Sequence, residues 1–224
     1  MNEFVAPHRP TLTIGVLTKN EAHRIAACLQ SAAFADEIVL VDSGSTDDTV
    51  AIAQRMGAKV FIHADWQGFA VQRNRLLAQA TGDYIFFLDA DEIITPALQA
   101  EVEAAVRSNA RAVWKIHWSV VAYGHELKHF LSQSSLERMF RRDMLVEYRG
   151  VVHEEPILAD ADKNAPRHVF HAKLLHYSRE TVRGSLEKLT QYSMLGAAKR
   201  AAAGKQGGVL RGLASGLAIF IRLY

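Results

Sequence analysis

Short apolar runs separated by amphipathic stretches fill the first half of the chain. Each run has the length of a strand and ends in polar or turn-forming residues, which is typical of buried strands. The runs are "LTIGVLT" (12–18), "EIVLVDSGS" (37–45), "AKVFIH" (58–63) and "DYIFFLDADE" (83–92). The stretches that follow them carry apolar residues at helical spacing, at 25–32, 46–57, 69–82 and 97–108. Four strand–helix alternations predict a parallel sheet covered on both faces.

A few residues set the expected helix boundaries. We expect Asp47 and Asp48 in the first turn of the 46–57 helix, at the positive end of its dipole, and Gly57 as its stop. Thr95 is the expected N-cap of the last of these helices, with Pro96 at its first position.

After residue 110 the pattern predicts strands and loops without regular helices between them. These segments are "AVWKIHWSVVAYG", "SLERMFRR", "MLVEYRGVVHE" and "RHVFHAKLLHYS". Thr181 is then the expected cap of a helix that ends near Gly204. We expect one α/β domain at 11–178, divided into halves at 11–110 and 111–178, and a helical tail at 179–224.

The tail has a composition of its own. From Lys199 to Tyr224 there are five basic residues and no acidic one, and Leu210, Leu213 and Leu217 fall at helical spacing. Two interpretations stay open: a helix that packs on the core, and a basic amphipathic helix that lies on an anionic membrane surface. The pattern stops at "IFIRLY" without a cap or breaker, as it would in a truncated segment.

Composition excludes several classes of protein. Hydrophobic residues make up 49 % and charged residues 22 %, which is ordinary for a globular protein, and the net charge of +2 gives no general attraction to nucleic acid. Cys28 is the single cysteine, so an internal disulfide framework and a cysteine-rich zinc site are excluded. The start lacks the layout of a secretion signal, and no apolar run approaches the roughly 20 residues that cross a bilayer. We therefore predict a cytoplasmic protein.

Polar residues follow three of the predicted strands. Thr18 ends the first, Asp42 and Ser43 end the second, and Asp89, Asp91 and Glu92 follow the fourth. Because ligands of parallel α/β sheets bind at the carboxyl ends of the strands, we expect these side chains in one cleft.

Asp89 and Asp91 alternate about an alanine. On extended backbone the two carboxylates would share a face and repel each other, and a hard cation such as Mg²⁺ or Mn²⁺ would relieve this. The alternative is that the acids cap a following turn. A phosphatase of the haloacid-dehalogenase kind places its Asp-x-Asp on the first strand, whereas the first strand here ends in "LTKNE".

The quoted segments resemble a family 2 glycosyltransferase with the GT-A fold. The resemblance rests on "TIGVLTKNEAHRIAACLQS", "EIVLVDSGSTDDTVAIAQRMGAKVF" and "QRNRLLAQATGDYIFFLDADE", and it extends from Thr11 to about Tyr192. The later "ERMFRR", "GVVHE" and "LLHYS" are similar to the bacterial lipopolysaccharide-core β-1,4-glucosyltransferase group. The implied fold is a Rossmann-like nucleotide-sugar-binding domain with a mixed central sheet, flanking helices and a C-terminal helical tail.

The resemblance implies roles for the residues at the strand ends. Asp89 and Asp91 would hold a divalent metal on a sugar-nucleotide diphosphate, which needs its charge neutralised before it can leave. The implied uridine pocket consists of Thr18, Glu21, Asp42 and Ser43. Arg73 and Asn74 would contact the diphosphate and nucleotide, although a plain surface role for Arg73 stays open.

An inverting transfer also needs a base for the acceptor hydroxyl. The resemblance favours Glu154 in "GVVHEEP", with Asp143 in reserve and Glu155 as a solvated neighbour. The grouping is not a metalloprotease site, because a second histidine is missing one turn on and Pro156 forbids the helix.

Histidines and arginines of the second half add further candidates. His168 and His171 would point to opposite faces of a strand, which counts against a histidine-only zinc site. His176 in "LLHYS" is either a third metal ligand, as in several GT-A enzymes, or a hydrogen-bonded core histidine. Alternation places Arg138 and Arg142 on one face, with Arg141 on the other, and one face would meet the diphosphate or an anionic acceptor.

The resulting hypothesis is a metal-dependent inverting hexosyltransferase. It would move glucose from a UDP-sugar to a lipid-linked saccharide acceptor of the lipopolysaccharide core or a related surface glycan. Because such lipid-linked acceptors are made at the cytoplasmic face of the inner membrane, we expect the basic tail to make peripheral contact with that face. Two alternatives remain: a sugar-nucleotide-forming nucleotidyltransferase, disfavoured because "VLTKNEAHR" lacks a glycine-rich loop, and a non-catalytic sugar-nucleotide-binding module.

Overall fold

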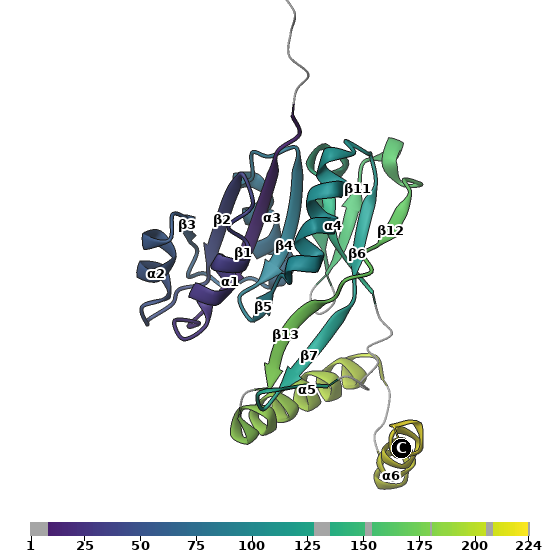
Figure 1. Cartoon of the computed structure of the whole chain (residues 1–224). Helices are drawn as coiled ribbons and strands as arrows, with labels where there is room; N and C mark the ends of the chain where they lie inside the picture. Colours follow the sequence, from purple (N-terminus) through teal and green to yellow (C-terminus); the bar gives the residue numbers. More distant parts are fainter. Residues whose placement is uncertain (1–8, 128–134, 151–153, 180, 205–207, 224) are drawn as a thin grey trace, which may run out of the picture. The chain divides into compact units, whose positions relative to one another are not determined.

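The computed structural model describes residues 9–127, 135–150, 154–179, 181–204 and 208–223 (Figure 1). The chain divides into two compact units, Met1–Ser178 and Arg179–Tyr224, and each is described by itself.

Seven strands of the described residues form the central sheet of the first unit, in the order β12-β6-β9-β4-β1-β2-β3. The parallel part consists of β1 (Leu12–Thr18), β2 (Glu37–Asp42), β3 (Lys59–Ile62) and β4 (Tyr84–Asp89). β9 (Leu136–Arg141) runs antiparallel between β4 and β6 (Val113–Ile116), and β12 (Arg167–Val169) pairs parallel with β6. The predicted mixed α/β sheet is confirmed.

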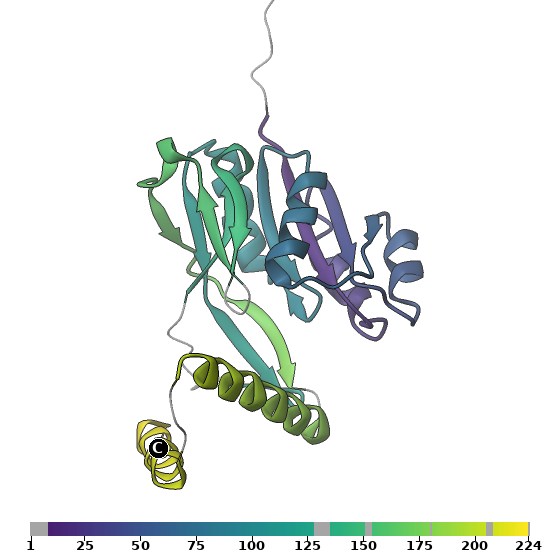
Figure 2. The same ribbon diagram turned by 180° about the vertical axis from the view of Figure 1, so that it is seen from behind.

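Helices cover both faces of this sheet (Figures 1 and 2). Apolar residues of α1 (Ile25–Ser31), α2 (Thr49–Arg55) and α4 (Pro96–Arg107) belong to one buried cluster. On the other face, α3 (Phe69–Gln79) shares a second cluster with the hairpin of β10 (Leu145–Arg149) and β11 (Glu155–Leu158). Sequential strands joined by helices bury both faces, which explains why β1 is buried at every position.

α3 lies close to β1 because Gly15 has no side chain. A Cβ atom at Gly15 would stand 2.0 Å from a methyl group of Leu76, which is itself fully buried in α3. Glycine is therefore required where the helix meets the strand, and the position of α3 on the sheet depends on it.

A second, small sheet extends the edge of the fold. Its order is β5-β13-β7-β8, from β5 (Glu92–Ile93), β13 (Leu174–Arg179), β7 (Trp118–Ala122) and β8 (His125–Glu126). Two 3₁₀ turns, η1 (Arg142–Met144) and η2 (Asp160–Asp162), complete the elements described for the first unit.

Most expected boundaries are confirmed, and two differ. Thr95 accepts a hydrogen bond from the Leu98 N–H (3.2 Å) as N-cap of α4, and Gly57 follows the end of α2 with a φ of +84°. The expectation for Asp47 and Asp48 is wrong, because α2 begins only at Thr49 and both acids precede its first turn.

The segment "RHVFHAKLLHYS" is also not one strand. It divides into β12 and β13, and His171 lies between them. His168 and His171 therefore do not share a strand, and the alternation argument does not apply to them.

The second unit consists of α5 (Val182–Ala202) and α6 (Val209–Leu223). Thr181 caps α5 as expected, since its Oγ1 accepts a hydrogen bond from the Gly184 N–H (3.0 Å). Val209, Leu210, Leu213 and Leu217 of α6 are exposed, and Lys205 lies outside the described residues. Among the helices described, none combines the length and hydropathy that a membrane span requires.

Candidate functional site

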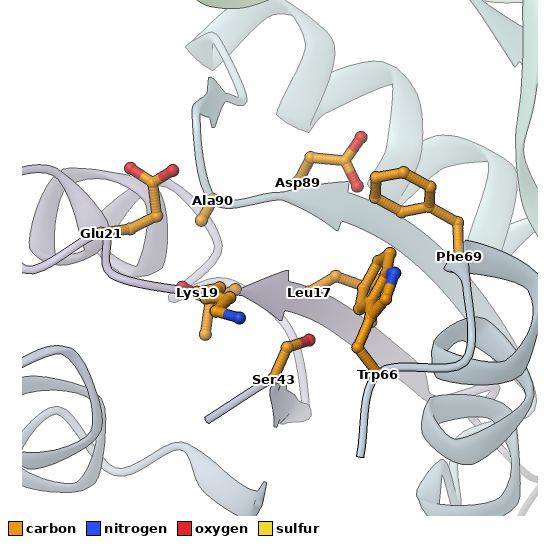
Figure 3. A pocket seen from close by; sticks show the side chains of 9 residues that line it. Leu17, Lys19, Glu21, Ser43, Trp66, Phe69, Asp89 and Ala90 are labelled. Atoms are coloured by element: carbon orange, nitrogen blue, oxygen red, sulfur yellow. The ribbon is translucent and has the colours of Figure 1, made fainter. Parts of the chain in front are cut away.

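A pocket opens at the carboxyl ends of β1, β2 and β4 (Figure 3). The strand register places Thr18 beside Asp42, and Leu17 beside Asp89, so polar strand ends from distant parts of the chain meet. The pocket has a volume of about 360 Å³ and is lined by Leu17, Thr18, Lys19, Glu21, Ser43, Trp66, Phe69, Asp89 and Ala90. Four residues selected from the sequence, Thr18, Glu21, Ser43 and Asp89, line it together.

Asp42 does not line the pocket, but its carboxylate holds the loop that contains Ser43. Its side chain is fully buried, and its Oδ1 accepts hydrogen bonds from the backbone N–H groups of Gly44 (2.9 Å) and Ser45 (2.8 Å). Its Oδ2 accepts from the Ser45 hydroxyl. The carboxylate fixes the loop after β2, and the nucleoside contact expected of Asp42 stays a prediction.

Thr18 at the end of β1 and Ser43 just after β2 are polar groups of the pocket lining. Ser43 donates its N–H to the Thr18 carbonyl (2.9 Å), and its Oγ accepts from the Gln72 amide (2.8 Å). Thr18 Oγ1 is buried and has no hydrogen-bond partner among the described residues. A buried hydroxyl costs free energy unless it is bonded, so Thr18 is a candidate to bond a ligand in the pocket.

Trp66 and Phe69 form an aromatic wall that we did not select from the sequence. Each is 47 % exposed, and their rings meet edge to face with centroids 4.9 Å apart. In Figure 3 they stand across the pocket from Glu21. Arg75 braces the loop through the Asp65 carboxylate (2.5 Å). The signal was present in "DWQGF", where two aromatic residues follow a strand among polar and glycine residues.

Asp89 ends β4 and is held by two arginines. Its Oδ1 lies 3.3 Å from Arg73 Nη2, and its Oδ2 lies 2.8 Å from Arg138 Nη2. Burial alone would raise the pKa of Asp89, but the charges of Arg138 and Arg73 outweigh it and hold the pKa well below its usual range. Asp89 is therefore ionised, and both its oxygens are occupied.

Glu92, expected in the cleft with Asp89 and Asp91, is a buried partner of Arg138 and is absent from the pocket lining. It is fully buried, and its Oε1 accepts from Arg138 Nη2 (2.9 Å) and Trp118 Nε1 (2.7 Å). Its Oε2 accepts from the Asp89 N–H (2.8 Å). Burial, opposed by Arg138, raises the pKa of Glu92 to about 7. Glu92 holds Arg138 and the end of β4 in place.

Asp91 does not share a face with Asp89, contrary to the expectation for extended backbone. β4 ends at Asp89, and Asp91 lies in the turn before β5. The turn is set by the Ala90 N–H, which donates to the Leu17 carbonyl (3.2 Å). The carboxylates then separate, Asp89 toward the arginines and Asp91 toward His176.

Asp91 and His176 form a pair. Asp91 Oδ2 lies 3.3 Å from His176 Nε2, and the antiparallel pairing of β13 with β5 sets His176 opposite Glu92. The His176 ring also packs on Trp118, with centroids 4.9 Å apart. Burial lowers the pKa of His176, but the hydrogen bond and charge of Asp91 outweigh it and the net shift is upward.

These residues fit a divalent cation in part. Asp91 and His176 offer a carboxylate oxygen and an imidazole nitrogen, and Mg²⁺ commonly takes one or two carboxylates and completes its shell with phosphate oxygens and water. Within the part of the chain that the structure describes, no three His, Cys, Asp or Glu side chains are grouped to hold a metal. Asp89 would first have to exchange an arginine for the ion, so its role as a ligand stays a prediction.

Glu154 reaches the site through Arg73. Arg73 Nε lies 3.1 Å from Glu154 Oε1, and the same guanidinium contacts Asp89. Residues 151–153, including His153, lie outside the described residues. Glu155 is exposed in β11, and Asp143 lies in η1, where it pairs with Arg111 (2.6 Å).

Asn74 and the other arginines have contacts outside the pocket lining. Asn74 bonds both the carbonyl (3.0 Å) and the N–H (2.6 Å) of Tyr148, so it ties α3 to β10. Arg138 and Arg142 do not share a strand face, because β9 ends at Arg141 and Arg142 opens η1. Arg142 donates to the Gly82 carbonyl (2.8 Å), and Arg141 bonds Asn109.

The fold and the pocket together define a class: an α/β enzyme of the GT-A type, with its ligand site at the carboxyl ends of a mixed sheet. The sequence profile of Glycosyl transferase family 2 matches residues 13–152, and the chain belongs to this family. The predicted GT-A glycosyltransferase is thereby confirmed.

Relatives in this family are similar over part of their length. The chain is 35 % identical over 151 residues to the SPbeta prophage-derived glycosyltransferase SunS of Bacillus subtilis, covering 66 % of this chain and 35 % of that one. It is 45 % identical over 89 residues to an uncharacterized glycosyltransferase of Rickettsia felis, covering 39 % and 31 %. The chain thus spans about a third of the length of these relatives.

Solved structures share the fold at low sequence identity. TarS residues 1–349 of S. aureus in complex with UDP-GlcNAc has a TM-score of 0.56 at 20 % identity, covering 76 % of this chain and 59 % of that one. Glucosyl-3-phosphoglycerate synthase of Mycobacterium tuberculosis, in complex with Mn²⁺, UDP and glucosyl-3-phosphoglycerate, has a TM-score of 0.57 at 19 % identity, covering 89 % and 82 %.

Proposed function

We propose that this glycosyltransferase is an inverting hexosyltransferase that uses UDP-glucose as its donor. The observation that carries the proposal is the pocket at the ends of β1, β2 and β4, with Asp91, His176 and Glu154 grouped around Asp89 and its arginines. A UDP-sugar donor is also supported by the bound ligands named for two proteins of the same fold, UDP-GlcNAc and UDP with Mn²⁺.

Donor binding would use the walls of the pocket. Thr18, with its unbonded hydroxyl, and Ser43 would contact the nucleoside together with Glu21, which pairs with Arg24 (2.8 Å). Trp66 and Phe69 would supply apolar faces for a ring of the donor. Lys19 lines the same pocket and adds a positive charge that favours a diphosphate.

The divalent cation, Mg²⁺ or Mn²⁺, would be held by Asp91 and His176, with Asp89 after exchange, and would neutralise charge on the departing diphosphate. Arg138 would contribute positive charge behind Asp89, where it is already shared between Asp89 and Glu92.

Glu154 would act as the base. As the acceptor oxygen bonds to the anomeric carbon, the bond from that carbon to the diphosphate oxygen breaks on the opposite face. The configuration is thereby inverted. The hydroxyl proton passes to Glu154, and UDP carries away the electron pair.

The acceptor that we propose is a lipid-linked saccharide of the lipopolysaccharide core or a related surface glycan. The support is the similarity of "ERMFRR", "GVVHE" and "LLHYS" to the lipopolysaccharide-core glucosyltransferase group. We further propose a transferase domain at 11–178 and a basic tail at 179–224. The tail would hold the enzyme on the cytoplasmic face of the inner membrane.

Calorimetric binding of UDP, with and without Mn²⁺, tests the donor site in the wild type and in Asp91→Ala. We expect Mn²⁺ to tighten UDP binding in the wild type and to lose this effect in Asp91→Ala. UDP binding that ignores both the ion and the substitution would contradict the metal assignment. The absence of any UDP binding would contradict the proposal that the donor is a UDP-sugar.

UDP release from UDP-glucose separates a transferase from a binding module. With a lipopolysaccharide-core saccharide as acceptor, the wild type should release UDP and Glu154→Gln should lose about 10²- to 10⁴-fold in kcat, the usual contribution of a general base. Pyrophosphate exchange in place of UDP release would indicate a nucleotidyltransferase.

A further inference from the structure

Arg73 contacts two of the carboxylates to which the proposed reaction gives a role, Asp89 and Glu154. Its Nε lies 3.1 Å from Glu154 Oε1, and its Nη2 lies 3.3 Å from Asp89 Oδ1. The guanidinium is planar and rigid, so two carboxylates bound to different nitrogens of it are fixed relative to each other. Arg73 therefore fixes Asp89, at the end of β4, and Glu154, just before β11, relative to each other.

Two aromatic rings flank the Arg73 guanidinium. Its guanidinium carbon lies 5.5 Å from the centre of the Phe87 ring and 5.7 Å from that of Tyr148. The next residue, Asn74, ties α3 to the backbone of Tyr148, and Gly15 lets α3 sit close against β1. The side chain therefore has little freedom to follow a ligand.

The environment of Arg73 differs from that of a phosphate ligand. Its side chain is only 7 % exposed, and two of its three nitrogens are occupied by carboxylates. The third, Nη1, is buried and has no hydrogen-bond partner among the described residues, so it is the one nitrogen of the guanidinium that a ligand could still engage. Arg73 is, however, absent from the lining of the pocket. A diphosphate in the pocket would thus meet Lys19 and not the guanidinium of Arg73.

We propose that Arg73 is a positioning residue for Glu154 and that it does not bind the diphosphate. The inference rests on the proposed role of Glu154 as the base. Glu154 itself lies outside regular secondary structure, immediately before β11, so no strand or helix geometry fixes the direction of its side chain. Arg73 holds the Glu154 carboxylate on the same guanidinium that contacts Asp89, where the reacting bond of the donor would lie.

This role predicts a split between kcat and donor affinity. Arg73→Met should lower kcat for UDP release from UDP-glucose by about 10- to 100-fold, as part of what a general base contributes. UDP affinity, measured by calorimetry with Mn²⁺, should change by less than about threefold. Arg73→Lys keeps the positive charge but loses the planar guanidinium that binds two carboxylates at once, and it should recover part of the lost kcat.

A double-mutant cycle shows whether Arg73 acts through Glu154. In the Glu154→Gln background, Arg73→Met should cause no further loss of kcat, because the group that it positions is already gone. Equal losses in both backgrounds would overturn the proposal, and so would a fall in UDP affinity of more than about tenfold in Arg73→Met. The second result would return Arg73 to the role of a diphosphate ligand.

Controls separate this inference from the proposed function. Arg107→Met removes an exposed arginine of α4 that pairs with Glu103 one turn earlier, and it should leave kcat and UDP affinity unchanged. Water can serve as the acceptor in the assay. If the wild type releases no UDP, the proposed donor fails, and UDP affinity in Arg73→Met alone then decides between the two roles of Arg73. Thermal melting with UDP shows whether Arg73→Met folds. If it does not fold, Arg73→Lys is compared with the wild type in its place.

Discussion

At the scale of single residues, the site depends on carboxylates that are already paired. Asp89 is shared by two arginines, Glu92 by Arg138 and Trp118, and Asp91 is paired with His176. Each pairing offsets the free-energy cost of holding a charge away from water. Ligand binding at this site is therefore an exchange of partners, and not the filling of an unsatisfied acid cluster.

Trp66→Ala tests the aromatic wall. If the uracil ring stacks on Trp66, UDP affinity should fall by about 5- to 100-fold, since stacking of a base on an aromatic side chain contributes about 1–3 kcal/mol. Calorimetry with UDP and Mn²⁺ measures the loss, and Trp66→Phe should recover most of it.

The matched control is Tyr123→Ala, because Tyr123 has the same 47 % exposure and lies in the β7–β8 turn. Unchanged UDP affinity in Trp66→Ala would show that the wall does not contact the nucleotide.

Single residues also show the limit of what the sequence predicts. Thr18, Ser43 and Asp89 could be placed together because parallel strands end at one edge of a sheet. The partners of Asp89 could not, because they depend on tertiary pairing: Arg138 enters on β9, which is inserted antiparallel beside β4, and Arg73 lies on α3. Trp66 was missed for a similar reason, since only the packing of its loop makes it a pocket wall.

At the scale of elements, Glu37 joins the strands at the end of the sheet opposite the pocket. Its carboxylate accepts from Lys59 Nζ of β3 (2.7 Å), from Thr13 Oγ1 of β1 (2.6 Å) and from the Thr81 N–H before β4 (2.9 Å). Burial raises the pKa of Glu37, but these hydrogen bonds outweigh it and lower the pKa from 4.5 to about 2.

Glu37→Gln should destabilise the protein in a way that depends on pH. A carboxylate whose folded pKa is lowered stabilises the fold above its unfolded pKa, and this stabilisation is lost as pH falls through the folded pKa. We expect a loss of about 1–3 kcal/mol in the free energy of unfolding at neutral pH, shrinking between pH 4.5 and about pH 2. Urea denaturation across this range measures it.

Glu103→Gln is the control for this series. Glu103 pairs with Arg107 on the surface of α4, and exposed pairs contribute little to stability, so the change should stay below about 1 kcal/mol. A difference between Glu37→Gln and the wild type that does not vary with pH would refute the linkage.

Element types were more predictable than their pairing. The apolar runs predicted β1 to β4 because a buried strand needs little more than length and β-forming residues, and Thr95 and Gly57 marked helix ends by local chemistry. A turn after Asp89 was one of two interpretations of the acids, and the sequence did not decide between them, because the arginines and the histidine that separate the two carboxylates are brought there by tertiary pairing.

At the scale of the whole molecule, the exposed apolar residues of α6 call for a partner surface. Leu210 and Leu213 are 84 % and 66 % exposed, and the segment from Lys199 to Tyr224 carries basic residues without an acidic one. This combination fits an anionic lipid surface, as proposed for the tail.

Co-sedimentation with vesicles tests this contact. The chain should bind vesicles that contain phosphatidylglycerol more tightly than vesicles of phosphatidylcholine alone, and added salt should weaken the binding. Leu210→Ser with Leu213→Ser should lower the affinity at least about tenfold, since each buried leucine contributes about 1.5–3 kcal/mol. Val146→Ser, which removes an exposed apolar residue of β10, is the control. Equal binding to both kinds of vesicle would contradict the electrostatic part of the proposal.

The pairing of Asp91 with His176 has a consequence for how the protein is made. The pocket is built from residues 17–90, whereas the histidine belongs to β13, near the end of the first unit. On the ribosome, β1 to β4 are complete well before His176 has been translated, but a domain generally folds as one unit, and His176 lies in the same unit as the pocket. We therefore expect nucleotide recognition to appear only after β13 has been translated, so that a prematurely terminated chain would neither bind donor nor consume it.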